Sequence, residues 1–373
     1  MTALTFALVV AVFIIVMSLA VGMEKAFASS GDPLNVIVLR PGAQSEGQSQ
    51  VQHERYQIIR NLEGIARAAD GEPLVAPEVI VLENKQKRGA PEGVESLSNL
   101  QIRGVSPQSF EMRPNVKLVA GEMFDPALRE AIVSRRVSER FEGMDLNAKI
   151  RLSADEWTIV GLFEAGGSAF DSEVWTDHRR LAESFDRRGA YSSIAVRAID
   201  AAAAQSLIQR IEDDPQLKLE PRIETEYYES QTTSSTIGIK ILAGILAVVM
   251  SIGVAFAGAN AMYANVANRT REIGAMRVLG FTPFSILICF VLESIALALL
   301  GGGLGCLLSL PMNGVATGTT NFTTFSEIAF AFTITPKLML QGLTIGLAIG
   351  FFGGLLPAFS ASRRPIVETL RKA

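Results

Sequence analysis

The chain has 373 residues, of which 49% are hydrophobic and 19% are charged, and its formal net charge is −4. A soluble protein usually has about 25% charged residues, and here the deficit is concentrated in four long stretches with almost no charge. Only a membrane accommodates such stretches as separate elements. The two cysteines, Cys289 and Cys306, lie in one apolar stretch, and His53 and His178 are the only histidines. A disulfide framework is therefore excluded, and the composition predicts no cysteine or histidine metal centre.

Each of the four apolar stretches contains the roughly 20 residues that a helix needs to cross about 30 Å of hydrocarbon. Backbone polar groups find no water there, so helices are the expected form. The predicted transmembrane helices cover residues 1–23, 236–264, 283–312 and 337–361. The first stretch can also be read as a signal peptide, because Ala26-Phe27-Ala28 resembles a cleavage motif. It has no basic residues before it and is longer than the usual apolar core, which favours a membrane anchor.

The basic residues predict the orientation. Arg269, Arg271 and Arg277 lie in the short connection 265–282, and the tail 362–373 holds four basic residues against one acidic residue. The connection 313–336 holds a single charged residue, a glutamate. The positive-inside rule places 265–282 and the tail in the cytoplasm, and therefore places 24–235 and 313–336 outside. We expect a multi-pass protein of the plasma (inner) membrane with a large extracytoplasmic domain between helices 1 and 2.

Residues 24–235 alternate strand patterns with amphipathic helices, which predicts an α+β domain of two subdomains. The patterns indicate strands at 35–40, 77–83, 99–104 and 217–223, a helix at 54–69, a hairpin at 148–163, and a helix capped by Asp200. The block holds 25 Lys and Arg against 34 Asp and Glu, a difference of −9. This acidity argues against nucleic acid as a partner. We find no catalytic constellation in the block and interpret its acidic residues as a solubilising surface, so the chain is not expected to be an enzyme.

The segment 268–281 follows one predicted span directly and precedes another. It resembles the cytoplasmic loop of FtsX-like (MacB-type) ABC transporter permeases, whose pattern is Arg-x-x-Glu-[Ile/Phe]-Gly-x-x-[Arg/Lys]-[Ala/Val]-[Leu/Val/Ile]-Gly. The matching positions here are Arg269, Glu272, Ile273, Gly274, Arg277, Leu279 and Gly280. Glu293 in the next span and the segments 104–107, 119–124, 157–163 and 357–371 also match in order. The resemblance covers nearly the whole chain and implies the same topology, an α-helical membrane protein with four transmembrane helices and a large α+β extracytoplasmic domain.

The same resemblance implies a function. The chain would be the permease subunit of an ABC transporter, coupling ATP hydrolysis on a separate cytoplasmic ATPase to movement of the extracytoplasmic domain, for export or release of a substrate. ATP and Mg are expected on that partner, because no Gly-x-x-x-x-Gly-Lys-[Ser/Thr] occurs in the chain. Further expected partners are a second permease copy, a periplasmic adaptor and membrane lipid. Relatives usually carry a basic amphipathic segment before the first span, and some carry a fused ATPase; the sequence shows neither. The alternatives are an FtsX-type regulator of a cell-wall hydrolase and a membrane-anchored receptor without an ATPase.

On a helix, Ile273, Met276 and either Leu279 or Gly280 form one apolar stripe, with arginines at its margins. Such a helix suits a groove on a partner protein or the membrane surface. The alternative is a solvated basic loop that binds no partner. The resemblance implies a coupling helix that docks on the ATPase. The residues predicted to couple the ATPase are Arg269, Arg271, Glu272, Ile273, Met276, Arg277, Leu279 and Gly280.

Two further features lie at membrane depth. Glycines recur at intervals of four along spans three and four, which predicts close helix packing rather than ligand binding. These glycines are Gly301, Gly305, Gly342, Gly346, Gly350 and Gly354. Glu293 is the only carboxylate at depth, so it should face the bundle or be protonated. We favour a structural hydrogen bond over a proton or substrate relay, because the sequence offers no second buried ionisable group as its partner.

Overall fold

The computed structural model describes residues 2–89, 96–321 and 324–363. The chain divides into two compact units. The helical unit comprises residues 1–22, 237–315 and 332–373, and the sheet unit comprises residues 23–236 and 316–331.

A ten-stranded sheet forms the framework of the sheet unit, in the order β12-β1-β11-β3-β4-β9-β6-β8-β5, with β7 also paired to β8. A separate two-stranded sheet joins β2 to β10. The strands are β1 (Asn35–Leu39), β2 (Val51–Gln52), β3 (Val75–Gln86), β4 (Leu97–Val105), β5 (Lys117–Gly121), β6 (Glu130–Ser134), β7 (Lys149–Leu152), β8 (Asp155–Glu164), β9 (Glu173–Asp177), β10 (Ala190–Tyr191), β11 (Ser193–Arg197) and β12 (Glu220–Ile223). The predicted hairpin at 148–163 is the antiparallel pair β7–β8.

Strand β3 connects two halves of this sheet because it changes partners along its length. Val75 to Glu78 pair with β11, whereas Val79 to Gln86 pair with β4. We call β12-β1-β11 with the start of β3 the first half-sheet, and the rest of β3 with β4, β9, β6, β8, β5 and β7 the second half-sheet. Each half-sheet has its own buried apolar cluster, one around Val38 and Leu207 and one around Trp157. The sheet thus has two separate apolar cores along one continuous set of strands.

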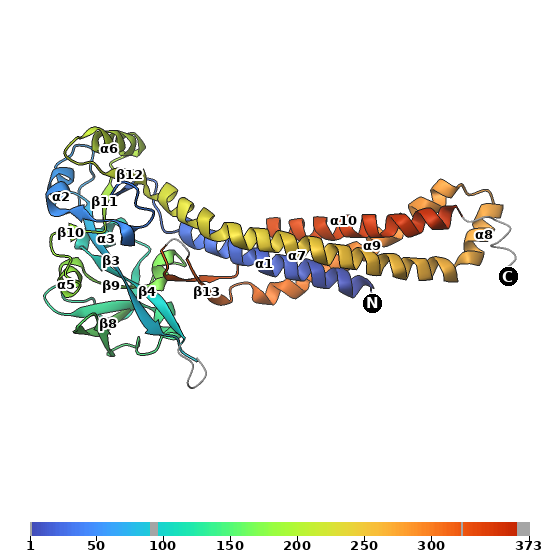
Figure 1. Ribbon diagram of the computed structural model, residues 1–373, viewed down its shortest axis with the longest axis horizontal. Helices are drawn as coiled ribbons and strands as arrows, with labels where there is room; N and C mark the ends of the chain where they lie inside the picture. The colour runs from blue at the N-terminus through green and yellow to red at the C-terminus, as the bar shows by residue number, and fades with distance from the viewer. Residues whose placement is uncertain (1, 90–95, 322–323, 364–373) are drawn as a thin grey trace. The chain divides into compact units, whose positions relative to one another are not determined.

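Short helices cover these half-sheets. They are η1 (Glu46–Gln48), α2 (His53–Arg60), α3 (Pro107–Met112), α4 (Arg135–Arg140), η2 (Ala169–Ser172), α5 (His178–Ser184) and α6 (Ala201–Asp213). Helix α6 packs on β1 and β12, and α5 packs on β4 and β9 (Figure 1). The carboxylate of Asp200 accepts a hydrogen bond from the Ala203 amide, which confirms the predicted N-cap. The predicted helix 54–69 is too long: α2 ends at Arg60, and Gly64 has φ +93°, which a continuing helix does not allow.

The segment 313–336, expected to be a short loop, contains a β-hairpin. Its strands β13 (Ala316–Thr320) and β14 (Glu327–Ala331) pair antiparallel and belong to the sheet unit. The Ser172 hydroxyl accepts a hydrogen bond from the Ala329 amide, and Asn99 donates its side-chain N–H to the carbonyl of Phe325. Single-sequence patterns miss this hairpin because its stability comes from contacts with residues far away in the chain.

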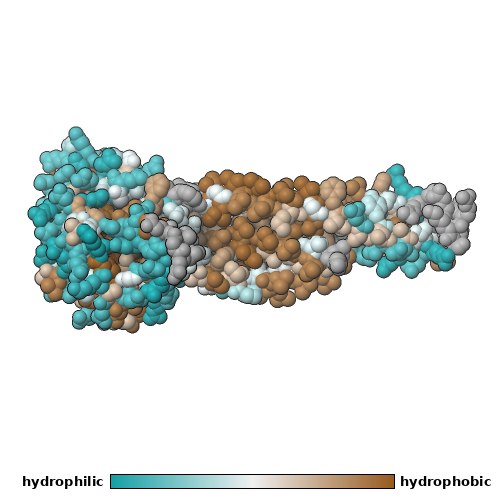
Figure 2. Space-filling view, turned by 60° about the horizontal axis from the view of Figure 1, so that its bottom comes forward, coloured by the Kyte–Doolittle hydropathy of each residue, from teal (hydrophilic) through white to brown (hydrophobic). Residues whose placement is uncertain are grey.

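In the described part of the chain, the helical unit contains four helices that are long and apolar enough to cross a membrane. Its elements are α1 (Thr2–Ala28), α7 (Glu224–Asn268), α8 (Thr270–Val278), α9 (Pro283–Ser309), η3 (Leu310–Met312) and α10 (Pro336–Ser362), with the end of α1 and the first turns of α7 belonging to the sheet unit. Figure 2 shows a hydrophobic surface over most of the helical unit and a hydrophilic surface over the sheet unit. Large apolar side chains on this surface, such as Val248 and Phe256 of α7, are more than half exposed, which suits contact with lipid.

The six glycines predicted for helix packing lie at close helix contacts. A Cβ added at Gly301 would lie 2.6 Å from the Ala3 carbonyl oxygen, and one at Gly305 would lie 2.6 Å from that of Ala7, both on α1. On α10, Gly342 and Gly346 face Ile14 and Val10 of α1, and Gly350 and Gly354 face Ala298 and Ser294 of α9. The glycines let the backbones approach closely, which is a main source of helix association in lipid.

This packing gives a prediction with an internal control. Replacing Gly301 with Val should force α1 and α9 apart, at a cost of about 1–3 kcal/mol for overpacking. Replacing Gly303 of the same helix with Val should be tolerated, because a Cβ there meets nothing within 4 Å. Thermal stability of the detergent-solubilised protein checks the pair. Equal thermal unfolding midpoints for G301V and G303V would contradict the close contact between α1 and α9 at Gly301.

Candidate functional site: a connecting helix and a buried charge network

Helix α8 occupies the predicted coupling segment, but Ile273 and Met276 of the predicted apolar stripe face inward, whereas Leu279 and Gly280 are exposed. Ile273 is 2% exposed and Met276 is partly buried. Both pack in a cluster with Met262 of α7, Phe290 of α9 and Ala358 of α10. Ile273 and Met276 therefore hold α8 against its own bundle and are not free to enter a groove on a partner.

The outward face of α8 consists of different residues. Arg271, Glu272, Ala275, Val278 and Leu279 are exposed, and Leu279 is 78% exposed. These residues recur at helical spacing, so the exposed face has a polar start and an apolar end. It is the surface of α8 that a partner can contact.

Arg277, in the last turn of α8, and Gly280, two residues after its end, shape the C-terminus of the helix. The Arg277 guanidinium donates a hydrogen bond to the Phe281 carbonyl oxygen at 3.4 Å. Gly280 has φ +95°, and its amide donates to the Arg277 carbonyl oxygen. Glycine fits this left-handed conformation, which turns the chain towards α9. These two residues shape the connection rather than present a docking surface.

Glu293 has an ionisable neighbour that the sequence analysis did not identify. A guanidinium nitrogen of Arg269, the residue before α8, lies 3.5 Å from a Glu293 carboxylate oxygen on α9. The Arg269 side chain is 52% exposed, so it is not a second buried ionisable group. The pair links the start of α8 to α9 and favours the structural role of Glu293 over a relay.

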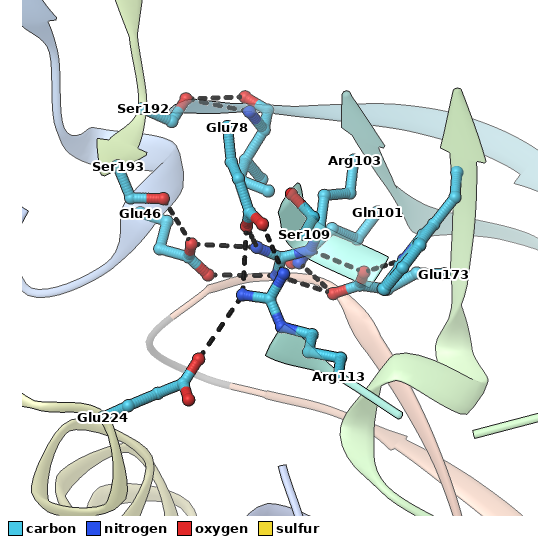
Figure 3. Close-up of polar contacts among 12 residues, drawn as sticks. Glu46, Glu78, Gln101, Arg103, Ser109, Arg113, Glu173, Ser192, Ser193 and Glu224 are labelled. Atoms are coloured by element: carbon cyan, nitrogen blue, oxygen red, sulfur yellow. Dashed lines mark hydrogen bonds and ion pairs between the residues drawn. The ribbon is translucent and has the colours of Figure 1, made fainter. Parts of the chain in front are cut away.

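The sheet unit contains a buried charge network in which Arg103 of β4 is central (Figure 3). Arg103 is 1% exposed, and its guanidinium donates to three carboxylates. It bonds Glu173 at 2.8 and 2.9 Å, Glu46 at 2.9 and 3.0 Å, and Glu78 at 2.6 Å. Neutral donors add further hydrogen bonds: Ser193 donates to Glu46 at 2.7 Å, and Gln101 and Trp175 each donate to Glu173 at 2.6 Å. Hydrogen bonding of this kind is what buried charges require.

A second guanidinium extends this network to α7. Arg113, which follows α3, donates to both carboxylate oxygens of Glu78 and, at 3.4 Å, to Glu224, the first residue of α7. The other oxygen of Glu224 accepts from the Asn35 side chain at 2.7 Å. The Arg113 guanidinium also lies over the ring of Phe170, 4.8 Å from its centroid. We define the charge network as Glu46, Glu78, Arg103, Arg113, Glu173 and Glu224.

Electrostatics favour the charged forms of Glu78 and Arg103 at the centre of this network, whereas burial raises the pKa of Glu224 at its edge. Burial by itself would raise the pKa of Glu78, but the charges of Arg113 and Arg103 outweigh it and lower the pKa to about 2. Burial would lower the pKa of Arg103, but Glu173, Glu46 and Glu78 raise it above its ordinary value. Glu78 and Arg103 therefore stay ionised at neutral pH.

These residues were not predicted from the sequence, because the acidic residues of this block were interpreted as a solubilising surface. Two signals were present. Glu78 interrupts the apolar strand Val75–Leu82, and Arg103 follows Ile102 in a neighbouring apolar strand. Opposite charges in two buried strands indicate an internal ion pair, because an isolated charge there would be too costly.

Glu327 of the hairpin makes another buried ion pair. Its side chain is 2% exposed, and its carboxylate lies 2.5 Å from the Lys87 ammonium and also pairs with Arg140 at the end of α4. Burial would raise the pKa of Glu327, but Lys87, Ser98 and Arg140 together lower it. This pair attaches β14 to the rest of the sheet unit.

The lowered pKa of Glu327 gives a pH prediction. A carboxylate whose pKa is lower when folded contributes stability above its unfolded pKa of 4.5, and this is lost as pH falls through the folded value. Hydrogen-exchange protection of the β14 amides should therefore fall on acidification. In E327Q the free energy of opening that this protection reports should be lower by about 1.5–3 kcal/mol at neutral pH, and the protection should change less with pH. E156Q, at the exposed pair Lys149–Glu156, is the control. The same acid response in E327Q as in the unsubstituted protein would contradict this assignment.

Within residues 2–89, 96–321 and 324–363, no group of three or more His, Cys, Asp or Glu side chains is placed to hold a metal ion. The two histidines flank one tyrosine ring, that of Tyr191, with centroids at 5.9 Å for His53 and 6.0 Å for His178. His178 is buried, and its Nδ1 lies 3.1 Å from the Val105 carbonyl oxygen. These contacts assign the histidines to packing of the sheet unit.

Comparison with known proteins identifies both parts of the chain. Residues 1–214 match the MacB-like periplasmic core domain, and residues 244–366 match the FtsX-like permease C-terminal domain. A macrolide export ATP-binding/permease protein MacB from Hahella chejuensis is 29% identical over 74% of this chain and 43% of its own length. The MacB protein of Bordetella avium is 24% identical over 91% of this chain and 52% of its length. The chain thus spans about half the length of these curated relatives.

Among solved structures, the periplasmic region of MacB from Actinobacillus actinomycetemcomitans is 12% identical, with a TM-score of 0.39, over 52% of this chain and 91% of that chain. The extracellular domain of the ABC-type transporter YknZ from Gram-positive bacteria is 14% identical, with a TM-score of 0.36, over 50% of this chain and 98% of that chain. The two family matches together cover most of the sequence, including α8 and the charge network except Glu224. The chain belongs to the MacB-like, FtsX-like family of ABC transporter permeases.

Proposed function

We propose that this chain is the permease subunit of an ABC transporter in which a separate cytoplasmic ATPase drives movement of the sheet unit, for export or release of a substrate. The observation that supports the proposal best is the exposed face of α8. It lies on a short helix between α7 and α9, two helices of membrane-spanning length. A partner that binds this face can displace both α7 and α9 at once.

The orientation follows from the basic residues. By the positive-inside rule, Arg269, Arg271 and Arg277 favour an orientation with α8 on the cytoplasmic side. Four crossings then place the sheet unit and its hairpin outside, in an extracytoplasmic compartment. The basic tail supports the same orientation, although residues 364–373 lie outside the described part of the chain.

The coupling has a physical route through the helices. Helix α7 is one continuous element from Glu224 to Asn268, so a displacement at its cytoplasmic end reaches its other end without a break. The Arg269–Glu293 pair and the buried Ile273 fix α8 to α9, so that α8 moves with the bundle. ATP and Mg would be bound by the partner, a second permease copy would complete the membrane part, and a periplasmic adaptor would receive the substrate.

The test is whether ATP hydrolysis by the associated ATPase depends on α8. The complex is purified from membranes through a tag on this chain. Replacing Glu272 and Arg277 with Ala should abolish the coupling of ATP hydrolysis to transport while leaving membrane insertion intact. Glu272→Ala alone reports on the docking face, because Arg277 also shapes the end of the helix. Lys337→Ala, at an exposed position at the start of α10, is the control.

Two outcomes would reject the proposal. Absence of a stoichiometric ATPase from the purified complex would favour a membrane receptor that works without one. Unchanged coupling in both the Glu272 variant and the double variant would show that α8 is not the coupling element.

A further inference from the structure

The charge network lies where the two half-sheets meet. Glu78 is the last residue of β3 that pairs with the first half-sheet, and Val79 is the first that pairs with the second. Arg103 contacts Glu78 at this point and connects it to Glu173 at the start of β9 and to Glu46 of η1. The network therefore joins both half-sheets through side chains, in addition to the backbone of β3.

The start of α7 is fixed to the same place. Glu224 is fully buried, and its carboxylate accepts from the Asp32 amide and the Asn35 side chain, just after α1 ends, as well as from Arg113. The backbone of Gly31 passes so close that an added Cβ would lie 2.8 Å from the Thr225 backbone. The end of α1 and the start of α7 therefore cannot move apart without breaking these contacts.

Arg113 is the only side chain of the charge network that contacts both Glu224 and Glu78 (Figure 3). Its surroundings resist rearrangement: the ring of Phe170 lies 4.8 Å away on one side, and the ring of Trp175 is 5.9 Å from the guanidinium carbon. Separating a buried ion pair exposes each charge to an apolar environment, which costs far more than separating a pair in water. The three residues should therefore move as one body.

Stability alone does not account for this arrangement. Well-packed apolar residues commonly replace a buried ion pair with no loss of stability, whereas ion pairs impose a fixed geometry. We propose that Arg113 is a positioning residue that couples the first turn of α7 to both half-sheets, so that a displacement of α7 moves the whole sheet unit. This inference rests on the proposed function, because it requires α7 to be displaced by the ATPase.

Hydrogen–deuterium exchange of the full complex, measured by mass spectrometry in lipid nanodiscs, tests the proposal. Exchange is compared without nucleotide and with ATP plus vanadate. In the unsubstituted protein, ATP should change exchange in the first turns of α7 and also in α3 and the segments of β3 and β4 around Glu78 and Arg103. In E224Q, the amide oxygen still accepts from Asn35, but the charge that pairs with Arg113 is absent. The ATP-dependent change should persist in α7 and fall about fivefold or more in α3, β3 and β4.

Two further variants make the result specific. R113M removes the guanidinium that pairs with Glu224, and it should give the same pattern of ATP-dependent exchange as E224Q. E72Q, at the exposed Arg60–Glu72 pair of the same unit, should behave as the unsubstituted protein. Unfolding followed by tryptophan fluorescence is measured in parallel. A purely structural role would lower the unfolding midpoint and leave the ATP-dependent difference in place.

The outcomes separate this inference from the proposed function. If ATP changes nothing in α7 of the unsubstituted complex, the proposed function fails. If ATP changes α7 but not α3, β3 and β4, or if E224Q transmits the change as the unsubstituted protein does, the role of Arg113 is refuted and the proposed function stands. Should R113M fail to fold, E224Q decides alone.

Discussion

Replacing Arg103 with methionine is expected to destabilise the sheet unit by about 3–5 kcal/mol, the usual cost of removing one partner from a buried ion pair. Methionine fills similar space but leaves Glu46, Glu78 and Glu173 buried without their shared cation. Both tryptophans of the chain, Trp157 and Trp175, are fully buried in this unit, so their fluorescence reports its unfolding. Urea unfolding followed by tryptophan emission measures the loss.

Arg60→Met is the control for this experiment. Arg60 pairs with Glu72 at the surface, and such pairs contribute about 0–1 kcal/mol. The defect of R103M should also lessen in acid, because the Glu78 carboxylate, whose pKa Arg113 and Arg103 lower in the folded protein, becomes protonated there. An unfolding curve of R103M equal to that of the unsubstituted protein would mean that the network contributes nothing to the fold.

Replacing Leu279 with glutamate is expected to release the ATPase from the complex. Leu279 is 78% exposed at the apolar end of the outward face of α8, so the substitution removes no internal packing. A buried apolar anchor at an interface typically contributes about 2 kcal/mol or more, which corresponds to roughly thirtyfold in affinity. The amount of ATPase recovered with this chain, measured by quantitative mass spectrometry, checks the prediction.

Ile199→Glu serves as the control for Leu279. Ile199 is 61% exposed and lies in the sheet unit, which the proposed orientation places on the other side of the membrane. Its substitution should leave ATPase recovery unchanged. Normal recovery with L279E, at normal membrane abundance, would contradict docking through this face.

The sequence predicted the four long helices well, because an uninterrupted apolar run of this length has few structural alternatives. It also placed the Asp200 cap and the β7–β8 hairpin, since both depend on neighbouring residues. Local sequence patterns do not indicate which strand pairs with which other strand in the sheet. The change of partner within β3 and the hairpin β13–β14 depend on contacts between distant segments, so they could not be predicted in this way.

The candidate site was likewise predicted only where it depends on neighbouring residues in the chain. The spacing of Ile273 and Met276 correctly indicated an apolar stripe on a helix, but spacing cannot tell whether such a stripe faces a partner or its own bundle. Glu293 was recognised as unusual, whereas its neighbour Arg269 lies 24 positions earlier in the chain and comes close only in the folded bundle. The charge network was missed because composition does not distinguish a buried carboxylate from an exposed one.

The most direct test of the central claim, that α8 is the cytoplasmic contact for an ATPase, is site-specific photo-crosslinking in intact membranes. A photoreactive residue is placed at the position of Ala275, on the exposed face of α8, and the captured proteins are identified by mass spectrometry. The account predicts capture of an ATP-binding subunit. Capture of an extracytoplasmic protein, or of the sheet unit of a second copy, would contradict it.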